Sequence, residues 1–280
     1  AAKYFMESRQ PIRFCYLGNT FTNTSSLQGK LKEVTQIGAE LVGDDSVEAD
    51  GEMISLVIEA LKNTGLKQFQ VSVGQVEYFK GICQEAGLDT ETEEQLREYI
   101  SGKNYFAAEE LLDQKEVAEP YRGTLLKAAD LFGSIDSLKK ARECVHNSRS
   151  LAAIQRLEAI YQVLKLYGVE EYVSFDLGML SKYHYYTGII FKAYTYGVGA
   201  PIVKGGRYDT LLRQFGKDAP AIGFAMVADD VLEAAQYQKV PLPQGMDKKI
   251  ITYTEVDYAL KLQEARESRH QGIPTLLVRA

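Results

Sequence analysis

The chain has 280 residues, 45% of them hydrophobic, and a formal net charge of -6 at pH 7. Its length and apolar content allow a large buried core, arranged as one domain or two. The acidic balance argues against a broad nucleic-acid surface, because phosphate neutralisation requires clustered Lys and Arg. No segment approaches the ~20 consecutive apolar residues that a membrane helix requires. We therefore expect a cytoplasmic protein that binds neither nucleic acid nor membrane.

The cysteines and histidines show no metal-binding or redox pattern. Cys15, Cys83 and Cys144 are widely separated and form no Cys-x-x-Cys pair, so neither a zinc site nor a disulfide framework is indicated. The three histidines lack metal-ligand spacing, and no phosphate loop of the Gly-x-x-x-x-Gly-Lys-Ser/Thr type is present. The sequence therefore predicts buried, reduced thiols and no metal or cofactor.

The first elements form a predicted hairpin followed by a helix. Residues 12–21 are rich in β-branched and aromatic side chains, residues 30–41 form a second extended candidate, and polar turn residues lie between them. We expect a long antiparallel hairpin. Asp44-Asp45-Ser46 then offers a cap for a helix that ends near Gly65.

Later segments predict an α+β domain. Residues 69–74 alternate as a strand, and a run of helices extends to about Gly168. Strand signals return from Tyr172 through residues 189–191 to 221–227, with a helical interruption at 208–214. Strands that are separated by loops, without regular β-α-β alternation, favour an antiparallel sheet flanked by helices.

A second, smaller domain is predicted at the C-terminal end. Residues 238–247 contain two prolines and are typical of a linker, while 248–280 contain the strand, helix and strand that start an α/β domain. We assign residues 1–237 to the core domain. One β-α-β unit cannot form a stable core alone, and the first residues lack a helix cap or an initiator Met. We therefore expect a fragment of a longer protein, with the small domain cut off at Ala280.

The pentapeptide Gln36-Ile37-Gly38-Ala39-Glu40 predicts a small polar pocket. On an extended strand, residues i, i+2 and i+4 share a face, so Gln36 and Glu40 point into the same space. Gly38 would leave a floor without side chains between them. The alternative is an ordinary solvated strand face.

Three segments, Lys182–Gly188, Lys204–Asp209 and Ala221–Ala225, closely resemble the histidine-specific part of the class II histidyl-tRNA synthetase core. The resemblance implies a class II synthetase-like antiparallel sheet. In that family the motif 2 sequence Gln-x-Gly-x-Glu binds the substrate: the Glu accepts a hydrogen bond from the imidazole, and the Gln contacts the amino-acid backbone. The second Tyr of Tyr-Tyr-Thr-Gly holds the other ring nitrogen.

By motif position these residues are Glu40, Gln36 and Tyr186. An imidazole offers one donor and one acceptor, so a carboxylate and a phenol can distinguish it from apolar rings. We expect Tyr185 to be a packing wall, and Gly205 and Gly206 to let the backbone approach the ligand closely. For Arg207 and Asp209 both a ligand contact and an internal ion pair remain open.

The resemblance also shows which catalytic groups are replaced. Thr22 stands where the synthetase has its motif 2 arginine, Ser181 where it has its histidine-specific arginine, and Asp230 where it has its motif 3 arginine. These groups stabilise negative charge on phosphate oxygens. Losing one such donor costs about 2.7–4 kcal/mol in activation free energy. We therefore expect a non-enzymatic binding protein.

The combination resembles the regulatory subunit of ATP phosphoribosyltransferase, a histidyl-tRNA synthetase paralogue, over about residues 4–237. The resemblance implies a short-form catalytic subunit as partner, free histidine as feedback effector in histidine biosynthesis, and a homodimer within a hetero-oligomer. Motif 1, the usual dimer element of class II synthetases, would precede Ala1. The alternatives are an active histidyl-tRNA synthetase and a catalytically inactive synthetase-like module with another partner.

Overall fold

The computed structural model describes residues 5, 7, 10–21, 32–180, 185–241 and 248–280. The chain divides into two compact units, Ala1–Val240 and Pro241–Ala280. The division falls inside the predicted linker 238–247. Gln238 still belongs to the first unit, because its side-chain amide donates to Thr195 Oγ1 at 2.8 Å.

The first unit is built on one large sheet. Its strands are β1 (Ile12–Phe21), β2 (Glu33–Val42), β3 (Phe69–Gln75), β4 (Phe132–Gly133), β5 (Val173–Asp176), β6 (Ile189–Thr195), β7 (Val203–Arg207) and β8 (Ala221–Val227). Its α-helices are α1 (Val47–Asn63), α2 (Val76–Glu85), α3 (Thr90–Ser101), α4 (Tyr105–Gln114), α5 (Glu119–Lys127), α6 (Asp136–Glu143), α7 (Ser148–Tyr167) and α8 (Ala228–Tyr237). Three short 3₁₀ helices are η1 (Ala128–Asp130), η2 (Glu170–Tyr172) and η3 (Leu211–Phe215).

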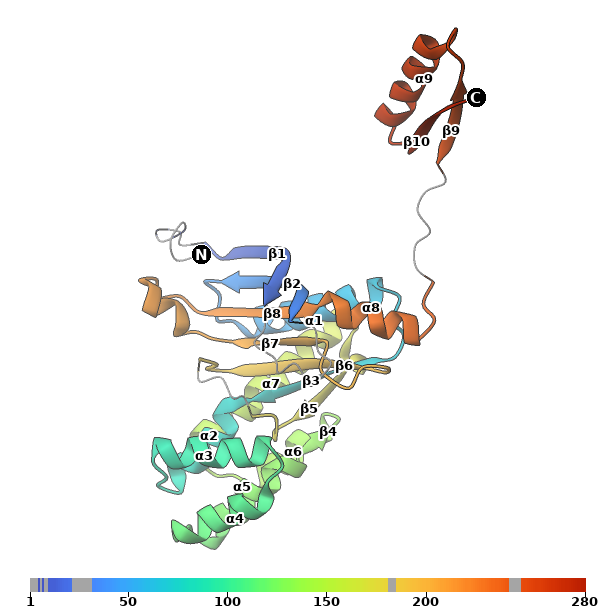
Figure 1. Cartoon of the computed structure of the whole chain (residues 1–280). Helices are drawn as coiled ribbons and strands as arrows, with labels where there is room; N and C mark the ends of the chain where they lie inside the picture. The colour runs from blue at the N-terminus through green and yellow to red at the C-terminus, as the bar shows by residue number, and fades with distance from the viewer. Residues whose placement is uncertain (1–4, 6, 8–9, 22–31, 181–184, 242–247) are drawn as a thin grey trace. The chain divides into compact units, whose positions relative to one another are not determined.

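The strands follow the order β1-β2-β8-β7-β6-β3-β5-β4, and every neighbouring pair is antiparallel except β3 and β5. Figure 1 shows β1 at one edge, and helices α2 to α6 gathered beyond the other end of the sheet. The predicted α+β class with a mainly antiparallel sheet is confirmed. The predicted hairpin is also present, with Ile12 opposite Val42 and Phe21 opposite Glu33.

One face of the sheet carries the core. Helix α1 is capped by Ser46, whose Oγ accepts from the Ala49 N–H at 3.1 Å. Helix α7 ends at Gly168 with a φ of 69°, the left-handed conformation that favours glycine. Both helices pack against this face and against each other. The largest fully buried side chains include Tyr78, Phe79, Phe175, Phe191, Leu41 and Ile54.

Strand β7 was not predicted, because two glycines interrupt it. Gly205 pairs with Phe191 of β6 and with Phe224 of β8. A Cβ at Gly205 would overlap the Phe191 ring and lie 2.6 Å from the Gly223 carbonyl oxygen. Glycine weakens a strand by its own propensity, but here the tight packing of the neighbouring strands requires it.

A buried ion-pair network ties β7 to the helices. The Arg207 guanidinium is 2% exposed and lies 2.7 Å from Asp50 Oδ1, and Asp50 is 0% exposed on α1. Arg156 of α7 donates to Asp50 Oδ2, also at 2.7 Å. Burial raises the pKa of the Asp50 carboxyl, and the two guanidiniums oppose that rise. This network joins the sheet, α1 and α7 at one point.

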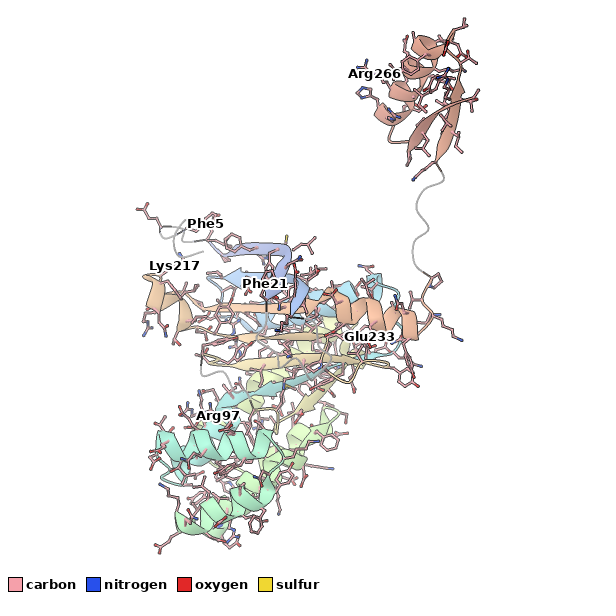
Figure 2. All side chains as sticks on the ribbon, in the orientation of Figure 1. Phe5, Phe21, Arg97, Lys217, Glu233 and Arg266 are labelled. Carbon is pink, nitrogen blue, oxygen red and sulfur yellow. The ribbon has the colours of Figure 1, made fainter. Side chains whose placement is uncertain are left out.

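The N-terminal region contacts the end of the sheet through Phe5. Lys217, which is 8% exposed, donates to the Phe5 carbonyl at 2.9 Å. The Phe5 ring meets Phe14 edge-on, with centroids 5.3 Å apart. Figure 2 labels Phe5 and Lys217 at the same end of the unit. Cys83 is buried, Cys144 is half-buried, and Cys15 on the edge strand β1 is exposed, so the prediction of buried thiols is confirmed for Cys83 alone.

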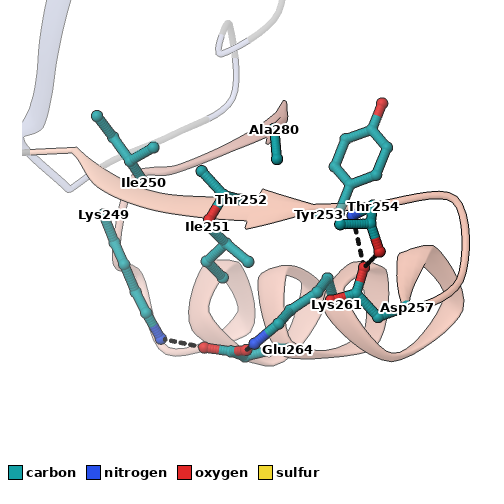
Figure 3. Close-up of a pocket in the computed structure, with 10 residues that line it drawn as sticks. All are labelled: Lys249, Ile250, Ile251, Thr252, Tyr253, Thr254, Asp257, Lys261, Glu264 and Ala280. Carbon is teal, nitrogen blue, oxygen red and sulfur yellow. Dashed lines mark hydrogen bonds and ion pairs between the residues drawn. The ribbon is translucent and has the colours of Figure 1, made fainter.

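The second unit contains β9 (Lys249–Tyr253), α9 (Tyr258–His270) and β10 (Thr275–Arg279). Strands β9 and β10 are parallel, as expected for a β-α-β unit. Lys249 and Lys261 each lie 3.1 Å from Glu264, beside a pocket of about 350 Å³ that Figure 3 shows. Lys249 and Lys261 therefore both pair with Glu264, and Asp257 accepts from Thr254. Within the described ranges, no helix is long and apolar enough to cross a membrane.

We expect Asp50→Asn to lower the free energy of unfolding by about 3–5 kcal/mol, because it leaves two guanidiniums without their buried counter-charge. Urea denaturation measures the change. Asp218→Asn is the matched control, since Asp218 pairs with Arg213 on the surface, where both side chains are about two-thirds exposed. That variant should lose less than about 1 kcal/mol. Equal losses in the two variants would contradict a central role for the Asp50 network.

Candidate functional site

The open face of the sheet, opposite α1 and α7, carries a row of glycines beside Glu40. Glu40 of β2 pairs with Gly223 of β8, which pairs with Gly206 of β7. A Cβ at Gly223 would collide with Glu40 Oε2, so the carboxylate lies directly on this glycine. A Cβ at Gly206 would lie 2.6 Å from the Tyr186 ring. The two glycines therefore let a carboxylate and a phenol ring lie close to the backbone.

Glu40 is held by a tyrosine hydroxyl. The Tyr208 hydroxyl donates to Glu40 Oε2. Among the described residues, no other group donates a hydrogen bond to this carboxylate. Burial raises the pKa of the Glu40 carboxyl, and the hydrogen bond from Tyr208 opposes the rise. The pKa of Tyr208 is also raised, first by its own burial and then by the Glu40 charge. Glu40 thus has one oxygen engaged and one remaining to accept a hydrogen bond.

Tyrosine rings surround the carboxylate. Tyr185 lies 4.4 Å from Tyr186 and 6.0 Å from Tyr208 between ring centroids, the second pair meeting edge-on. Tyr16 of β1 lies over Gly38, where an added Cβ would lie 2.5 Å from its hydroxyl oxygen. Burial and the Glu40 charge raise the pKa of Tyr16. We call Glu40 and these four tyrosines the tyrosine pocket.

The predicted pentapeptide is only partly as expected. Gln36, Gly38 and Glu40 share one face of β2, while Ala39 and Leu41 point to the other face and into the core, so the three lie on the open face. The floor at Gly38 is not empty, however, because the Tyr16 ring covers it. Gln36 lies four residues from Glu40, about 13 Å along the strand. Glu40 therefore lies in the tyrosine pocket, and Gln36 lies on the same face, two residues beyond Gly38.

The other site residues divide between the two faces. Tyr185, Tyr186 and Gly206 lie together at the pocket, and Gly205 faces the core, where it contacts Phe191. The prediction that Gly205 approaches a ligand is corrected, because successive strand residues point to opposite faces.

Arg207 and Asp209 form an internal ion pair, which was one of the two alternatives left open by the sequence; the other was a ligand contact. Arg207 Nη1 lies 3.1 Å from Asp209 Oδ1, and the Asp209 N–H donates to Thr187 Oγ1 at 2.9 Å.

Of the three replaced arginine positions, only Asp230 can be placed. It lies in the first turn of α8 beside Asp229, whose carboxylate accepts from the Thr35 N–H at 2.7 Å. Thr22 and Ser181 lie outside the described residues. Among the residues that the structure describes, no group of three His, Cys, Asp or Glu side chains could hold a metal ion.

Sequence reasoning missed Tyr16 and Tyr208 as pocket residues. Tyr208 belongs to the Lys204–Asp209 motif, and its place two residues after Gly206 was a usable signal. Tyr16 gave no local signal, since its position over Gly38 depends on the pairing register of the β1–β2 hairpin.

The raised pKa of Glu40 makes stability depend on pH. A carboxyl whose pKa is raised on folding binds protons more tightly in the folded state than in the unfolded state. Its contribution to the free energy of unfolding is therefore fully present below the unfolded-state pKa and is lost as the pH rises through the folded-state pKa. We expect wild-type protein to gain stability relative to Glu40→Gln as pH falls from 7.5 towards about 4.5. Urea unfolding at a series of pH values measures this difference. A difference that is constant with pH would contradict the raised pKa.

The chain matches the family model of the histidyl-tRNA synthetases over residues 1–231. It is 39% identical over 273 residues to the ATP phosphoribosyltransferase regulatory subunit of Acetivibrio thermocellus, covering 98% of this chain and 65% of that protein. It is 37% identical over 267 residues to the regulatory subunit of Caldanaerobacter subterraneus, covering 95% of this chain and 70% of that protein. The chain therefore spans roughly two thirds of the length of these curated relatives.

A solved structure from Bacillus halodurans, described as an ATP phosphoribosyltransferase regulatory subunit/histidyl-tRNA synthetase, has a TM-score of 0.85 and 31% sequence identity. The match covers 99% of this chain and 70% of that one. The class II synthetase-like fold agrees with the strand order and the helix-covered face described above. The chain belongs to the histidyl-tRNA synthetase family, in the group that its relatives define as ATP phosphoribosyltransferase regulatory subunits.

Proposed function

We propose that the chain is a non-catalytic regulatory subunit of ATP phosphoribosyltransferase that binds free histidine and confers feedback inhibition on the first step of histidine biosynthesis. It would act in a cytoplasmic hetero-oligomer, as a homodimer joined to short-form catalytic subunits. The names of its relatives support the regulatory role. Histidine as effector and the oligomeric state rest on the family resemblance and on the chemistry of the tyrosine pocket.

The observation that carries the proposal is the hydrogen-bonding capacity at Glu40. Its carboxylate is held against Gly223, with Oε2 engaged by Tyr208. Oε1 can accept from one imidazole nitrogen, and a tyrosine hydroxyl such as that of Tyr186 can donate to the other. An apolar ring of similar size would leave these buried polar groups unpaired, which is a strong basis for rejection. The tyrosine rings supply the flat surfaces that contact the imidazole.

The acidic residues at the start of α8 support a role without adenylate formation. Asp229 and Asp230 occupy the first turn of that helix, where the synthetase family has its motif 3 arginine. Negative charge there repels a nucleotide triphosphate. Together with Thr22 and Ser181 at the other arginine positions, this substitution removes the groups expected to stabilise the phosphoryl transition state.

A histidyl-tRNA synthetase is the second candidate, because the Bacillus halodurans structure is described by both names. Histidine-dependent ATP–pyrophosphate exchange distinguishes the candidates. Exchange at synthetase-like rates would favour the enzyme, whereas background exchange would favour the regulatory subunit. An inactive module with another partner is the third candidate, and it would bind no phosphoribosyltransferase subunit.

We expect Glu40→Ala to weaken histidine binding by about 1.5–3 kcal/mol, the range for a hydrogen bond to a charged group. Tyr186→Phe should weaken it by about 0.5–1.5 kcal/mol, the net value for a neutral hydrogen bond. Isothermal titration calorimetry of the full chain measures both. Glu33→Ala and Tyr167→Phe are matched controls, because both side chains are exposed and lie away from the tyrosine pocket. Unchanged affinity in both pocket variants would show that histidine binds elsewhere.

In the reconstituted complex, histidine should inhibit ATP phosphoribosyltransferase activity through this chain. A ligand shifts a complex only by binding its states with different affinity, so Glu40→Ala should require more histidine for half-inhibition. Steady-state rates across a histidine titration, with wild type and Glu40→Ala, test this expectation. Equal sensitivity would place the sensor in another subunit, and failure of the two proteins to associate would favour the third candidate.

A further inference from the structure

A second row of the open face lies next to the glycine row and carries two lysines. From β1 to β5 the paired residues are Tyr16, Gly38, Ala225, Lys204, Lys192, Ser72 and Ser174. Two residues of this row are charged, and both are lysines: Lys204 of β7 lies directly opposite Lys192 of β6. Directly opposed strand residues have Cα atoms about 5 Å apart, and like charges at such positions are destabilising. The sheet therefore concentrates positive charge at one place.

The chain itself leaves this charge largely uncompensated. In the part of the chain that the structure describes, neither lysine ammonium makes an ion pair or a hydrogen bond. Burial lowers the pKa of the Lys192 ammonium, Lys204 adds to that effect, and Asp176 opposes it. Asp176 keeps its charge but lies beyond ion-pair distance of Lys192, and its carboxylate accepts from the Gly178 N–H at 3.0 Å. On the other side of Lys204 lies Ala225, whose side chain is a single methyl group.

We propose that Lys192 and Lys204 bind the α-carboxylate of the amino acid whose imidazole occupies the tyrosine pocket. This inference rests on the proposed histidine binding and deepens it. Lys204 and Gly206 are two residues apart on β7 and share the open face, so about 7 Å of strand separates their rows. The Glu40 carboxylate lies on Gly223 and the Tyr186 ring on Gly206. An imidazole bound between these two groups would place the carboxylate of its amino acid within reach of the lysine ammoniums. Lysine is a point charge with three donors and suits an anion of this kind.

The test compares histidine with histidinol, in which an alcohol replaces the carboxylate, by calorimetry on the full chain. Wild type should bind histidine about tenfold to hundredfold more tightly than histidinol, as expected for a charge-assisted hydrogen bond. Lys204→Met and Lys192→Met should lose most of that preference and leave histidinol affinity nearly unchanged. A purely structural effect of either substitution would weaken both ligands alike.

Two further variants sharpen the comparison. Lys204→Arg keeps the charge and should keep most of the preference for histidine. Lys67→Met removes an exposed lysine of the loop before β3 and should change neither affinity. Thermal unfolding of each variant verifies that it is folded. Because Lys204 is exposed, its substitution should leave the transition temperature close to that of wild type.

Three results would overturn the inference. Equal binding of histidine and histidinol by wild type would overturn it alone, with the proposed function intact. The inference alone would also fail if inorganic phosphate bound wild type but not Lys204→Met, and histidine affinity were the same in both proteins. The lysines would then bind a separate anion. Absence of histidine binding by wild type would overturn both this inference and the proposed function.

Discussion

The ion pair between Asp50 and Arg207 is the constraint on which the pocket depends. Arg207 and Tyr208 are adjacent, and the chain leaves strand β7 between them, with the Tyr208 N–H donating to the Ala221 carbonyl at 2.7 Å. Since Arg207 is fixed against Asp50 on the helix-covered side, Tyr208 is directed to the open face, where it reaches Glu40. Arg207 also holds the neighbouring Thr187 through its own carbonyl, which accepts from the Thr187 N–H at 2.9 Å. One buried interaction thus fixes the two segments that bring Tyr185, Tyr186 and Tyr208 to the carboxylate.

A buried ion pair is a costly way to fix a strand, because both charges lose their hydration. Here the desolvation cost is reduced because the charged atoms have hydrogen-bond partners. Asp50 has a guanidinium at each oxygen, and Arg207 also donates to the Asp44 carbonyl at 2.9 Å. Hydrophobic residues in place of Asp50 and Arg207 could match the stability, but they would not fix how β7 is oriented against α1. The guanidinium and the carboxylate accept few alternative geometries, so the network selects one position of β7 relative to α1.

Local sequence signals predicted much of the fold and less of the pocket. The capping residue Ser46, the alternation of β3 and the polar turn of the hairpin each act within a few residues, so these elements could be predicted from the sequence. Strand β7 could not, because Gly205 and Gly206 have low strand propensity and their packing partners come from β6 and β8. Tyr16 is a similar case: its partner Gly38 lies across the hairpin, and only the register determines which residue it covers. The error at Gly205 arose because the motif shows only which residues are present. Which face of the sheet each residue lies on depends on the alternation along the strand.

The glycines at 206 and 223 explain why a strand that breaks the propensity rules is kept. Any side chain at Gly223 would displace the Glu40 carboxylate, and any side chain at Gly206 would displace the Tyr186 ring. Both groups would then move away from the backbone and into the space that the proposed imidazole would occupy. The loss of strand propensity is offset by the Asp50–Arg207 anchor at the end of the same strand. Departures from local rules are expected where a sequence serves a binding site, and here the departure and its compensation lie within residues 205–207. For the proposed histidine ligand the pocket is preorganised, because Tyr208 already orients the Glu40 carboxylate and the imidazole need only supply the donor for its second oxygen.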